Sequence, residues 1–211
     1  MCRMLWVQAR TIVSTGFYLD QFATVSRMSK EYQGHGWGIA YQSRNHWVQY
    51  RTTQPIWEDA LYRFGETDRM LVHARSAFQD RDIVVENNMP FIFDDIVFAF
   101  NGELRGVRLS IPGRTGAHKI LNLFHRFYEG DLAGALTRTV KVLQKQTRYI
   151  RALNMIISNG KHMVAYNYFN EDPEYFTMWK YQKQDVTVVA SEPLPALNPW
   201  KPLAFATVEE Y

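Results

Sequence analysis

The sequence has very little cysteine, and this scarcity limits the kinds of site it can build. Its 211 residues include a single cysteine, Cys2, so neither a disulfide framework nor a cysteine-based zinc site can form within one chain. No stretch approaches the roughly 20 apolar residues that a membrane-spanning helix needs, and the N-terminus lacks the apolar run of a signal peptide. We therefore expect a cytoplasmic protein that does not contact membranes and holds neither a metal ion nor a cofactor.

A strong excess of one charge is also missing. The net charge is +3 and the isoelectric point is near 8.9, which is only mildly basic. Binding to nucleic acid requires a cluster of Lys and Arg. One loose set lies at the end of a predicted helix, where the helix dipole favours cations: Lys141, Lys145, Arg148 and Arg151. We interpret it as a solvated helix end and expect no nucleic-acid partner.

Apolar residues are plentiful, and they support a β-rich interior. They make up 46% of the chain and aromatic residues 15%, a composition typical of strands packed in a sizeable core. No internal repeat, low-complexity tract or Pro/Ser-rich linker interrupts the chain. We therefore expect residues 2–211 to form a single domain.

The spacing of apolar residues predicts strands first, then a pair of helices, then more strands. The predicted strands are Arg3–Ala9, Gly36–Tyr41, His46–Tyr50, Met70–Phe78, Ile96–Phe100, Leu153–Ser158, Met163–Phe169, Tyr175–Tyr181 and Val186–Ala190. The predicted helices are Tyr18–Met28, Ile56–Phe64, Ala117–Tyr128 after an N-cap at Thr115, and one from a cap at Asp131 to about Arg148. This order predicts an α+β fold, a four-layer α/β/β/α sandwich of two antiparallel sheets flanked by helices.

The position of Cys2 gives it a chemical possibility that other positions lack. Cysteine is small enough to permit removal of Met1, and removal leaves one residue with both a thiol and a free α-amine. An α-amine has a pKa near 8, so a useful fraction is an unprotonated base at neutral pH. One residue can then supply both nucleophile and general base. A buried cysteine is also commonly just a small apolar residue, and position alone leaves both interpretations open.

Five further segments occur in an order that favours the catalytic interpretation. They follow Cys2 along the chain and are His73-Ala74-Arg75-Ser76-Ala77, Glu86-Asn87-Asn88-Met89-Pro90-Phe91, Phe100-Asn101-Gly102-Glu103-Leu104, Gly113-Arg114-Thr115-Gly116 and Ala190-Ser191-Glu192-Pro193-Leu194. Taken singly, an Asn-Gly pair is more typical of a turn and a lone arginine of a surface ion pair. In this order, however, the chain resembles the class II glutamine amidotransferases. Gly36-Trp37-Gly38-Ile39-Ala40 and Trp200 resemble the stand-alone branch of that family.

The resemblance implies a fold and a set of roles. The fold is the N-terminal-nucleophile hydrolase sandwich, and Cys2 would attack an amide carbon to give a thioester. The side-chain amide of Asn101 and the backbone N–H of Gly102 would stabilise the oxyanion. Arg75 would bind the substrate α-carboxylate through its planar guanidinium. Ser76 and Gly116 would complete the substrate-binding site.

Two positions depart from the family pattern. Gly116 stands where the family has an Asp that holds the ammonium group of glutamine. Glu103, Glu192 or a backbone carbonyl could substitute for that Asp. Met89 stands where the family often has a His, and it offers volume rather than a hydrogen bond. The nucleophile, oxyanion and carboxylate groups are therefore present, whereas the group that binds the substrate ammonium is missing.

The sequence leaves three functions open. The first is a glutaminase-type amidotransferase that delivers ammonia to a separate acceptor enzyme. The second is an amidohydrolase that acts on a small-molecule amide, such as a γ-glutamyl compound, with a modified or absent α-amine. The third is a non-catalytic binding or regulatory protein that retains the fold.

Overall fold

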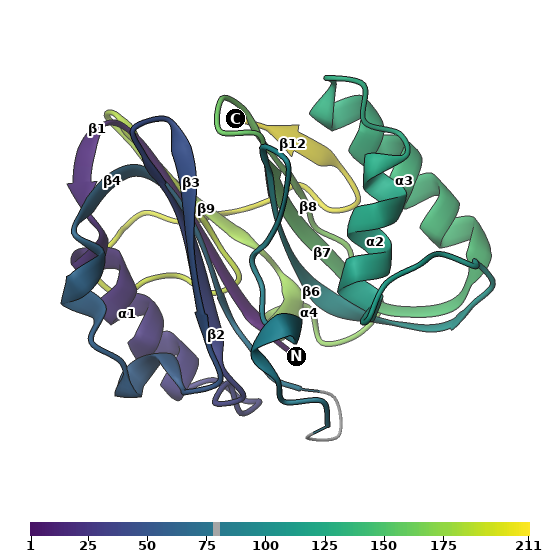
Figure 1. Ribbon diagram of the computed structural model, residues 1–211, viewed down its shortest axis with the longest axis horizontal. Helices are drawn as coiled ribbons and strands as arrows, with labels where there is room; N and C mark the ends of the chain where they lie inside the picture. The colour runs from purple at the N-terminus through teal and green to yellow at the C-terminus, as the bar shows by residue number, and fades with distance from the viewer. Residues whose placement is uncertain (78–80) are drawn as a thin grey trace.

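Two antiparallel sheets lie face to face, and helices cover both outer faces (Figure 1). The computed structural model describes residues 1–77 and 81–211. Helix α1 covers one sheet, and helices α2 and α3 cover the other. The predicted α+β sandwich with layers α/β/β/α is therefore confirmed. Among the described residues, no helix has the length and apolar character needed to cross a membrane.

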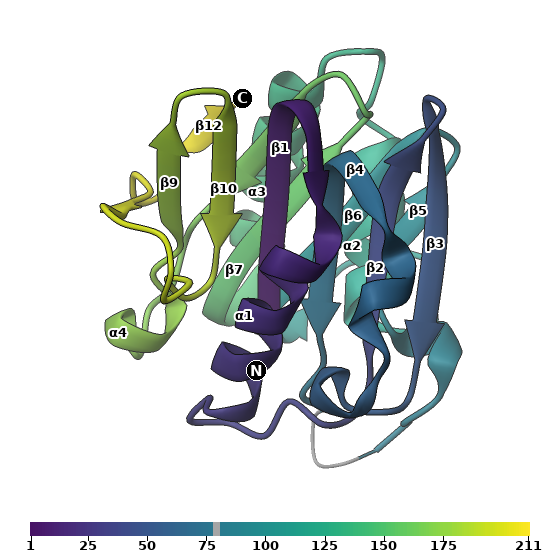
Figure 2. The same cartoon turned by 90° about the vertical axis from the view of Figure 1, so that its left-hand side faces the viewer.

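The first sheet has seven strands in the order β11-β9-β10-β1-β4-β2-β3, most of which Figure 2 shows face on. Their bounds are β1 Arg3–Ser14, β2 Trp37–Ser43, β3 His46–Thr52, β4 Glu66–Ala74, β9 Trp179–Lys183, β10 Val186–Ala190 and β11 Lys201–Pro202. The second sheet has the order β12-β8-β7-β6-β5. Its strands are β5 Phe91–Phe93, β6 Ile96–Val107, β7 Thr147–Ser158, β8 Met163–Tyr166 and β12 Val208–Glu210.

The helices of the described residues range from 4 to 15 residues in length. They are α1 Thr15–Arg27, α2 Gly116–His125, α3 Leu132–Gln146 and α4 Pro173–Phe176, with single 3₁₀ turns η1 Ile56–Glu58, η2 Leu61–Phe64 and η4 Val85–Asn87. Both predicted caps are confirmed. The Thr115 side chain accepts from the backbone N–H of His118 at 3.3 Å, and that of Asp131 accepts from Gly134 at 2.9 Å. These bonds satisfy N–H groups that have no partner within the first turn of a helix.

The core consists of three apolar layers, because the central strands are buried on both faces. Along β1, Leu5 and Val7 pack under α1, whereas Met4 and Trp6 face the other sheet. Along β6, Phe98 packs under α2 and α3, whereas neighbouring residues face the first sheet. Because both faces of these strands are buried, their sequences are continuous apolar runs in which polar and apolar residues do not alternate.

Several predicted boundaries were wrong. The predicted strand Tyr175–Tyr181 is divided between α4 and β9, and Pro173 begins that short helix. The predicted helix Ile56–Phe64 is two separate 3₁₀ turns, and the strand predicted over Met163–Phe169 ends at Tyr166. The strand predicted over Met70–Phe78 ends at Ala74, and Phe78 lies outside the described residues.

The prediction for the basic set was wrong in part: Lys145 lies in the last turn of α3, as predicted, but Arg148 and Arg151 lie outside the helix. Helix α3 ends at Gln146 and the chain enters β7 at Thr147, so the helix does not reach Arg148. Arg148 and Arg151 lie on a strand, and Arg151 has only 20% of its side chain exposed. The helix-dipole interpretation therefore does not apply to Arg151.

Truncation in the layer between the sheets tests this architecture. Ile156 is fully buried there, and Ile156→Ala should lower the free energy of unfolding by about 2–5 kcal/mol through lost burial and a residual cavity. Tyr62→Ala is the control, because Tyr62 is 84% exposed and its loss should change stability by less than about 0.5 kcal/mol. Urea unfolding of the three proteins measures both values. An equal effect of the two substitutions would contradict the layer assignment.

Candidate active site

Strand register places Cys2 opposite the predicted carboxylate-binding arginine. Strands β1 and β4 are antiparallel neighbours, with Arg3 opposite Ala74. The residue before Arg3 is Cys2, and the residues after Ala74 are Arg75 and Ser76, so all three lie at the same edge of the sheet. The thiol of Cys2 donates to the backbone carbonyl of Ser76, with a sulfur-to-oxygen distance of 3.7 Å.

A cavity of about 830 Å³ opens at this edge and reaches the other sheet and its helices. Five of the six predicted site residues line it: Cys2, Arg75, Ser76, Gly102 and Gly116. The remaining walls come from the end of β6, the segment that follows it, and the first turns of α2. A concave site with a few converging polar groups is the usual form of a small-molecule pocket.

Asn101 is the predicted site residue that the cavity walls do not include. It follows Ala99 on the face of β6 that looks toward the first sheet, whereas Gly102 reaches the cavity. Its side chain is fully buried, and among the described residues neither amide atom has a hydrogen-bond partner. Buried polar atoms without partners are rare and costly. The side-chain amide of Asn101 therefore has both its nitrogen and its oxygen without partners in the described structure, next to the cavity wall.

Burial controls the charge of the sulfur and of its surroundings. Desolvation raises the pKa of the Cys2 thiol above its ordinary value, although the nearby chain terminus and Arg75 act in the opposite direction. Desolvation also lowers the pKa of His73 to about 3, with the positive charge of Arg75 acting in the same direction. Both groups are therefore mainly neutral at pH 7.

Arg75 is held in place by neutral acceptors. Its terminal nitrogens donate to the side-chain oxygen of Asn88 at 3.0 Å and to the backbone carbonyl of Asp82 at 2.9 Å. Burial lowers the pKa of this guanidinium, but arginine stays protonated at physiological pH. Because each terminal nitrogen carries two N–H bonds, one on each remains to bind a substrate carboxylate.

Two glycines shape the opposite wall in different ways. A Cβ atom on Gly102 would lie 2.1 Å from the backbone oxygen of Ala152, so no side chain fits there. A Cβ on Gly116 would meet no atom within 4 Å, so the first turn of α2 is open toward the cavity. The absence of a side chain at Gly116 is therefore not imposed by packing.

Met89 has a partner that the sequence interpretation missed. It lines the cavity, and its sulfur accepts from the backbone N–H of Phe100 at 3.3 Å. The expectation that Met89 adds volume but no hydrogen bond was therefore wrong, since a thioether sulfur is a weak acceptor. This contact fixes the backbone immediately before Asn101.

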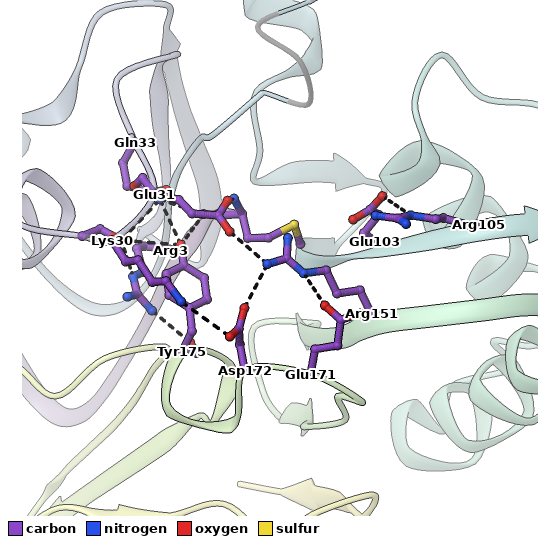
Figure 3. A network of polar contacts seen from close by, with 12 residues as sticks. Arg3, Lys30, Glu31, Gln33, Glu103, Arg105, Arg151, Glu171, Asp172 and Tyr175 are labelled. Carbon is purple, nitrogen blue, oxygen red and sulfur yellow. Dashed lines mark hydrogen bonds and ion pairs between the residues drawn. The ribbon is translucent and has the colours of Figure 1, made fainter.

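The N-terminus lies in a polar network that also went unforeseen (Figure 3). The Met1 amino group pairs with the carboxylate of Glu31. The Met1 carbonyl accepts from Gln33 at 2.7 Å and from the hydroxyl of Tyr175 at 2.6 Å. Within the described part of the chain, the side-chain oxygen of buried Gln33 has no partner. These residues surround the peptide bond that removal of Met1 would break.

Arg151 joins this network to the cavity from the second sheet. The register of β6 and β7 shifts at this point, because Glu103 pairs with Ala152 and Leu104 pairs with Ile150. The residue between them, Arg151, is extra in the ladder, and such a bulge can redirect a side chain. Its guanidinium pairs with Glu31, Glu171 and Asp172 at distances from 3.0 to 3.3 Å (Figure 3).

The carboxylates suggested as substitutes for the missing Asp are both paired. Glu103 lines the cavity, but its carboxylate contacts Arg105 at 2.6 Å. Glu192 pairs with Arg3 at 2.6 Å and lines a different cavity, beside Ser191 and Tyr175. Among the described residues, no three His, Cys, Asp or Glu side chains are grouped in a way that would hold a metal ion.

Comparison with known proteins identifies the family. The family model for class II glutamine amidotransferases matches residues 1–172. No curated protein matches the sequence.

Three solved structures share the fold at low sequence identity. A glutamine aminotransferase class-II domain protein from Silicibacter pomeroyi has a TM-score of 0.68 at 18% identity, over 100% of this chain and 97% of its own. A predicted glutamine amidotransferase from Pseudomonas aeruginosa has a TM-score of 0.58 at 17% identity, with the same two coverages. The glutamine phosphoribosylpyrophosphate amidotransferase from B. subtilis has a TM-score of 0.62 at 15% identity, over 90% of this chain and 42% of its own.

The predicted family is thereby confirmed, and the cavity beside Cys2 lies in a fold that these amidotransferases share. The matched region includes all six predicted site residues. This chain belongs to the class II glutamine amidotransferases.

Proposed function

We propose that this chain hydrolyses a carboxamide with Cys2 as the nucleophile, once Met1 has been removed. The observation that supports this most directly is that Cys2, Arg75 and Gly102 line one cavity. The thiol would attack the amide carbon, and its proton would pass to the α-amine of the same residue. The α-amine passes that proton to the amide nitrogen as the carbon–nitrogen bond breaks, so the nitrogen leaves as ammonia. Water then hydrolyses the thioester to a carboxylate, and a proton from this water restores the thiol.

The network around residue 1 supports the role of the α-amine. Removal of Met1 deletes the carbonyl that Gln33 and Tyr175 now bind. Because the amide of Gln33 can rotate, its oxygen, which has no partner in the described structure, can then accept from the new α-amine. The carboxylate of Glu31, which now pairs with the amino group of Met1, would then pair with that amine.

The oxyanion would be stabilised from β6. We assign this role to the backbone N–H of Gly102 and the side-chain amide of Asn101. The unpartnered amide of Asn101 supports the assignment, because binding an oxyanion would satisfy a buried donor that is otherwise unused. One such donor typically contributes about 3 kcal/mol of transition-state stabilisation.

Substrate binding would depend on Arg75 and the open first turn of α2. Arg75 keeps two N–H groups for a carboxylate, and the Ser76 carbonyl orients the thiol. Gly116 offers no charge for an ammonium group. We therefore favour an amidohydrolase whose substrate lacks a free α-ammonium over a glutaminase for free glutamine.

We also propose that residues 2–211 act as one amidotransferase domain. The family model ends at residue 172, but β10 lies beyond that point and pairs with β1 from Leu5 opposite Ala190 to Ala9 opposite Val186. The strand that carries Cys2 therefore depends on the C-terminal part of the chain.

Covalent labelling tests the nucleophile. The processed protein should gain one adduct of 6-diazo-5-oxo-norleucine, and peptide mapping should place that adduct on Cys2. Cys2→Ala should gain none, and Arg75→Lys should react roughly 10- to 100-fold more slowly, because a charge-assisted bidentate contact is lost. Intact mass spectrometry follows both rates. Retention of Met1 in the purified protein, or the absence of both adduct and ammonia with every amide tested, would contradict the proposal.

A carboxylate introduced at position 116 tests whether a missing negative charge there limits the use of substrates with a free α-ammonium. A Cβ atom at Gly116 meets no other atom within 4 Å, and an acid in the first turn of α2 is compatible with the helix dipole. We expect kcat/KM for free glutamine to rise about 10- to 100-fold, the worth of one charge-assisted hydrogen bond. Gly116→Asn is the matched control, with the same size and no charge. Equal activities of the Asp and Asn variants toward free glutamine would argue against a missing charge at this position.

A further inference from the structure

Six apolar side chains line the cavity from the second sheet and its helices, and the chemistry proposed above does not use them. Cys2 and Arg75 reach the cavity from the first sheet, whereas this apolar arm belongs to the second. Its walls come from the end of β6, the segment after it, α2 and α3: Leu104, Val107, Leu109, Ile111, Ile120 and Leu143. Most of these side chains belong to or pack against the core under the two helices, so the arm is a preformed part of the fold.

The whole cavity is larger than free glutamine requires. Its volume of about 830 Å³ is within the range of pockets that enclose drug-sized ligands. An amino acid held at Arg75 and Cys2 would fill the polar end and leave the apolar arm open. Leu104, Val107 and Leu109 keep apolar surface in contact with water, and a ligand that covers this surface gains binding free energy.

The charges in the cavity disfavour a free ammonium group. Among the described residues, four cationic side chains line it, Arg75, Arg105, Lys119 and Arg151, with the two carboxylates of Glu31 and Glu103. Arg151 and Arg105 already pair with those carboxylates. Lys119 has no ion pair within the described structure and lies on α2 three residues after Gly116, on the same side of the helix. Of the charged side chains that the structure describes around the cavity, an ammonium near Gly116 would meet unpaired positive charge and no unpaired carboxylate.

We propose that the substrate is a glutamine whose α-nitrogen carries an apolar acyl group. This inference rests on the function proposed above. Arg75 binds the α-carboxylate, Cys2 attacks the side-chain amide, and the acyl chain occupies the arm beside Ile120. Acylation converts the ammonium into a neutral amide, which matches the uncharged Gly116 and the cationic surroundings. An alkyl group on the side-chain nitrogen would also fill space, but it would leave the unfavourable ammonium in place.

The reaction releases one molecule of ammonia and leaves the acyl group attached. The bond that breaks joins the side-chain carbonyl carbon to its nitrogen, and water supplies the oxygen of the new carboxylate. The products are ammonia and an Nα-acyl glutamate. No oxidant, reductant or further co-reactant is needed.

A substrate series tests the acyl preference. Formation of the glutamate product is measured for free glutamine, Nα-acetyl-glutamine, Nα-octanoyl-glutamine and a glutamine with an octyl group on its side-chain nitrogen, because this last compound releases octylamine instead of ammonia. Each methylene buried in the arm should raise kcat/KM about fourfold, so the octanoyl compound should exceed the acetyl compound by at least about 100-fold. Free glutamine should be the poorest of the three compounds with an unsubstituted side-chain amide.

Variants of the arm supply the matched control. Val107 is 41% exposed at the cavity, and Val48 is 39% exposed on β3 outside it. Val107→Glu should lower kcat/KM for the octanoyl compound at least tenfold, whereas Val48→Glu should leave it unchanged. Leu109→Glu introduces the same charge at a second wall position and should reproduce the loss if the acyl chain binds in the arm.

The outcomes separate this inference from the function on which it rests. Equal kcat/KM for the acetyl and octanoyl compounds, or a preference for the side-chain-alkylated compound, would overturn the acyl-glutamine proposal while leaving Cys2 hydrolysis intact. Equal kcat/KM of Val107→Glu and Val48→Glu for the octanoyl compound would likewise overturn the acyl-glutamine proposal and leave Cys2 hydrolysis intact. Failure of Cys2 to form the diazo-oxo-norleucine adduct, with no ammonia from any compound, would overturn the proposed function itself.

Discussion

The site depends on the pairing of β1 as an inner strand of the seven-stranded sheet. Strand β10 holds one edge of β1 and β4 holds the other, so the chain is fixed up to Arg3. Because β4 is antiparallel to β1 and ends at Ala74, it turns away beside the residue where β1 begins. A terminal residue would ordinarily fray. Here Cys2 is instead held opposite Arg75, and its thiol contacts Ser76.

Burial then determines what those groups can do. The same desolvation that raises the pKa of Cys2 lowers the pKa of Arg75 and His73, so the nucleophile is mostly a thiol and needs a base. In the proposed mechanism that base is the α-amine, which becomes available on removal of Met1. In the same proposed mechanism, the buried and unpartnered amide of Asn101 recovers its free energy cost when charge develops on the substrate.

Much of the fold, and less of the site, could be predicted from the sequence. Apolar runs identified strands such as Ile96–Phe100, since burial on two faces needs them, and Thr115 and Asp131 marked helix starts through local capping chemistry. Arg151 could not be placed, because a bulge in β7 rather than its neighbours in sequence directs it into the cavity. Gln33 and Tyr175 meet at Met1 only through long-range contacts, which no local spacing encodes. The roles assigned to the six site residues stay predictions.

In the account proposed above, Cys2 and Arg75 bind one end of a glutamine-like substrate, and the apolar arm binds the rest. A crystal structure of the protein after reaction with 6-diazo-5-oxo-norleucine tests this most directly. The account predicts a covalent bond from the Cys2 sulfur to the ligand, with the ligand carboxylate about 3 Å from the guanidinium nitrogens of Arg75. An adduct on another residue, or a carboxylate that points away from Arg75, would contradict it.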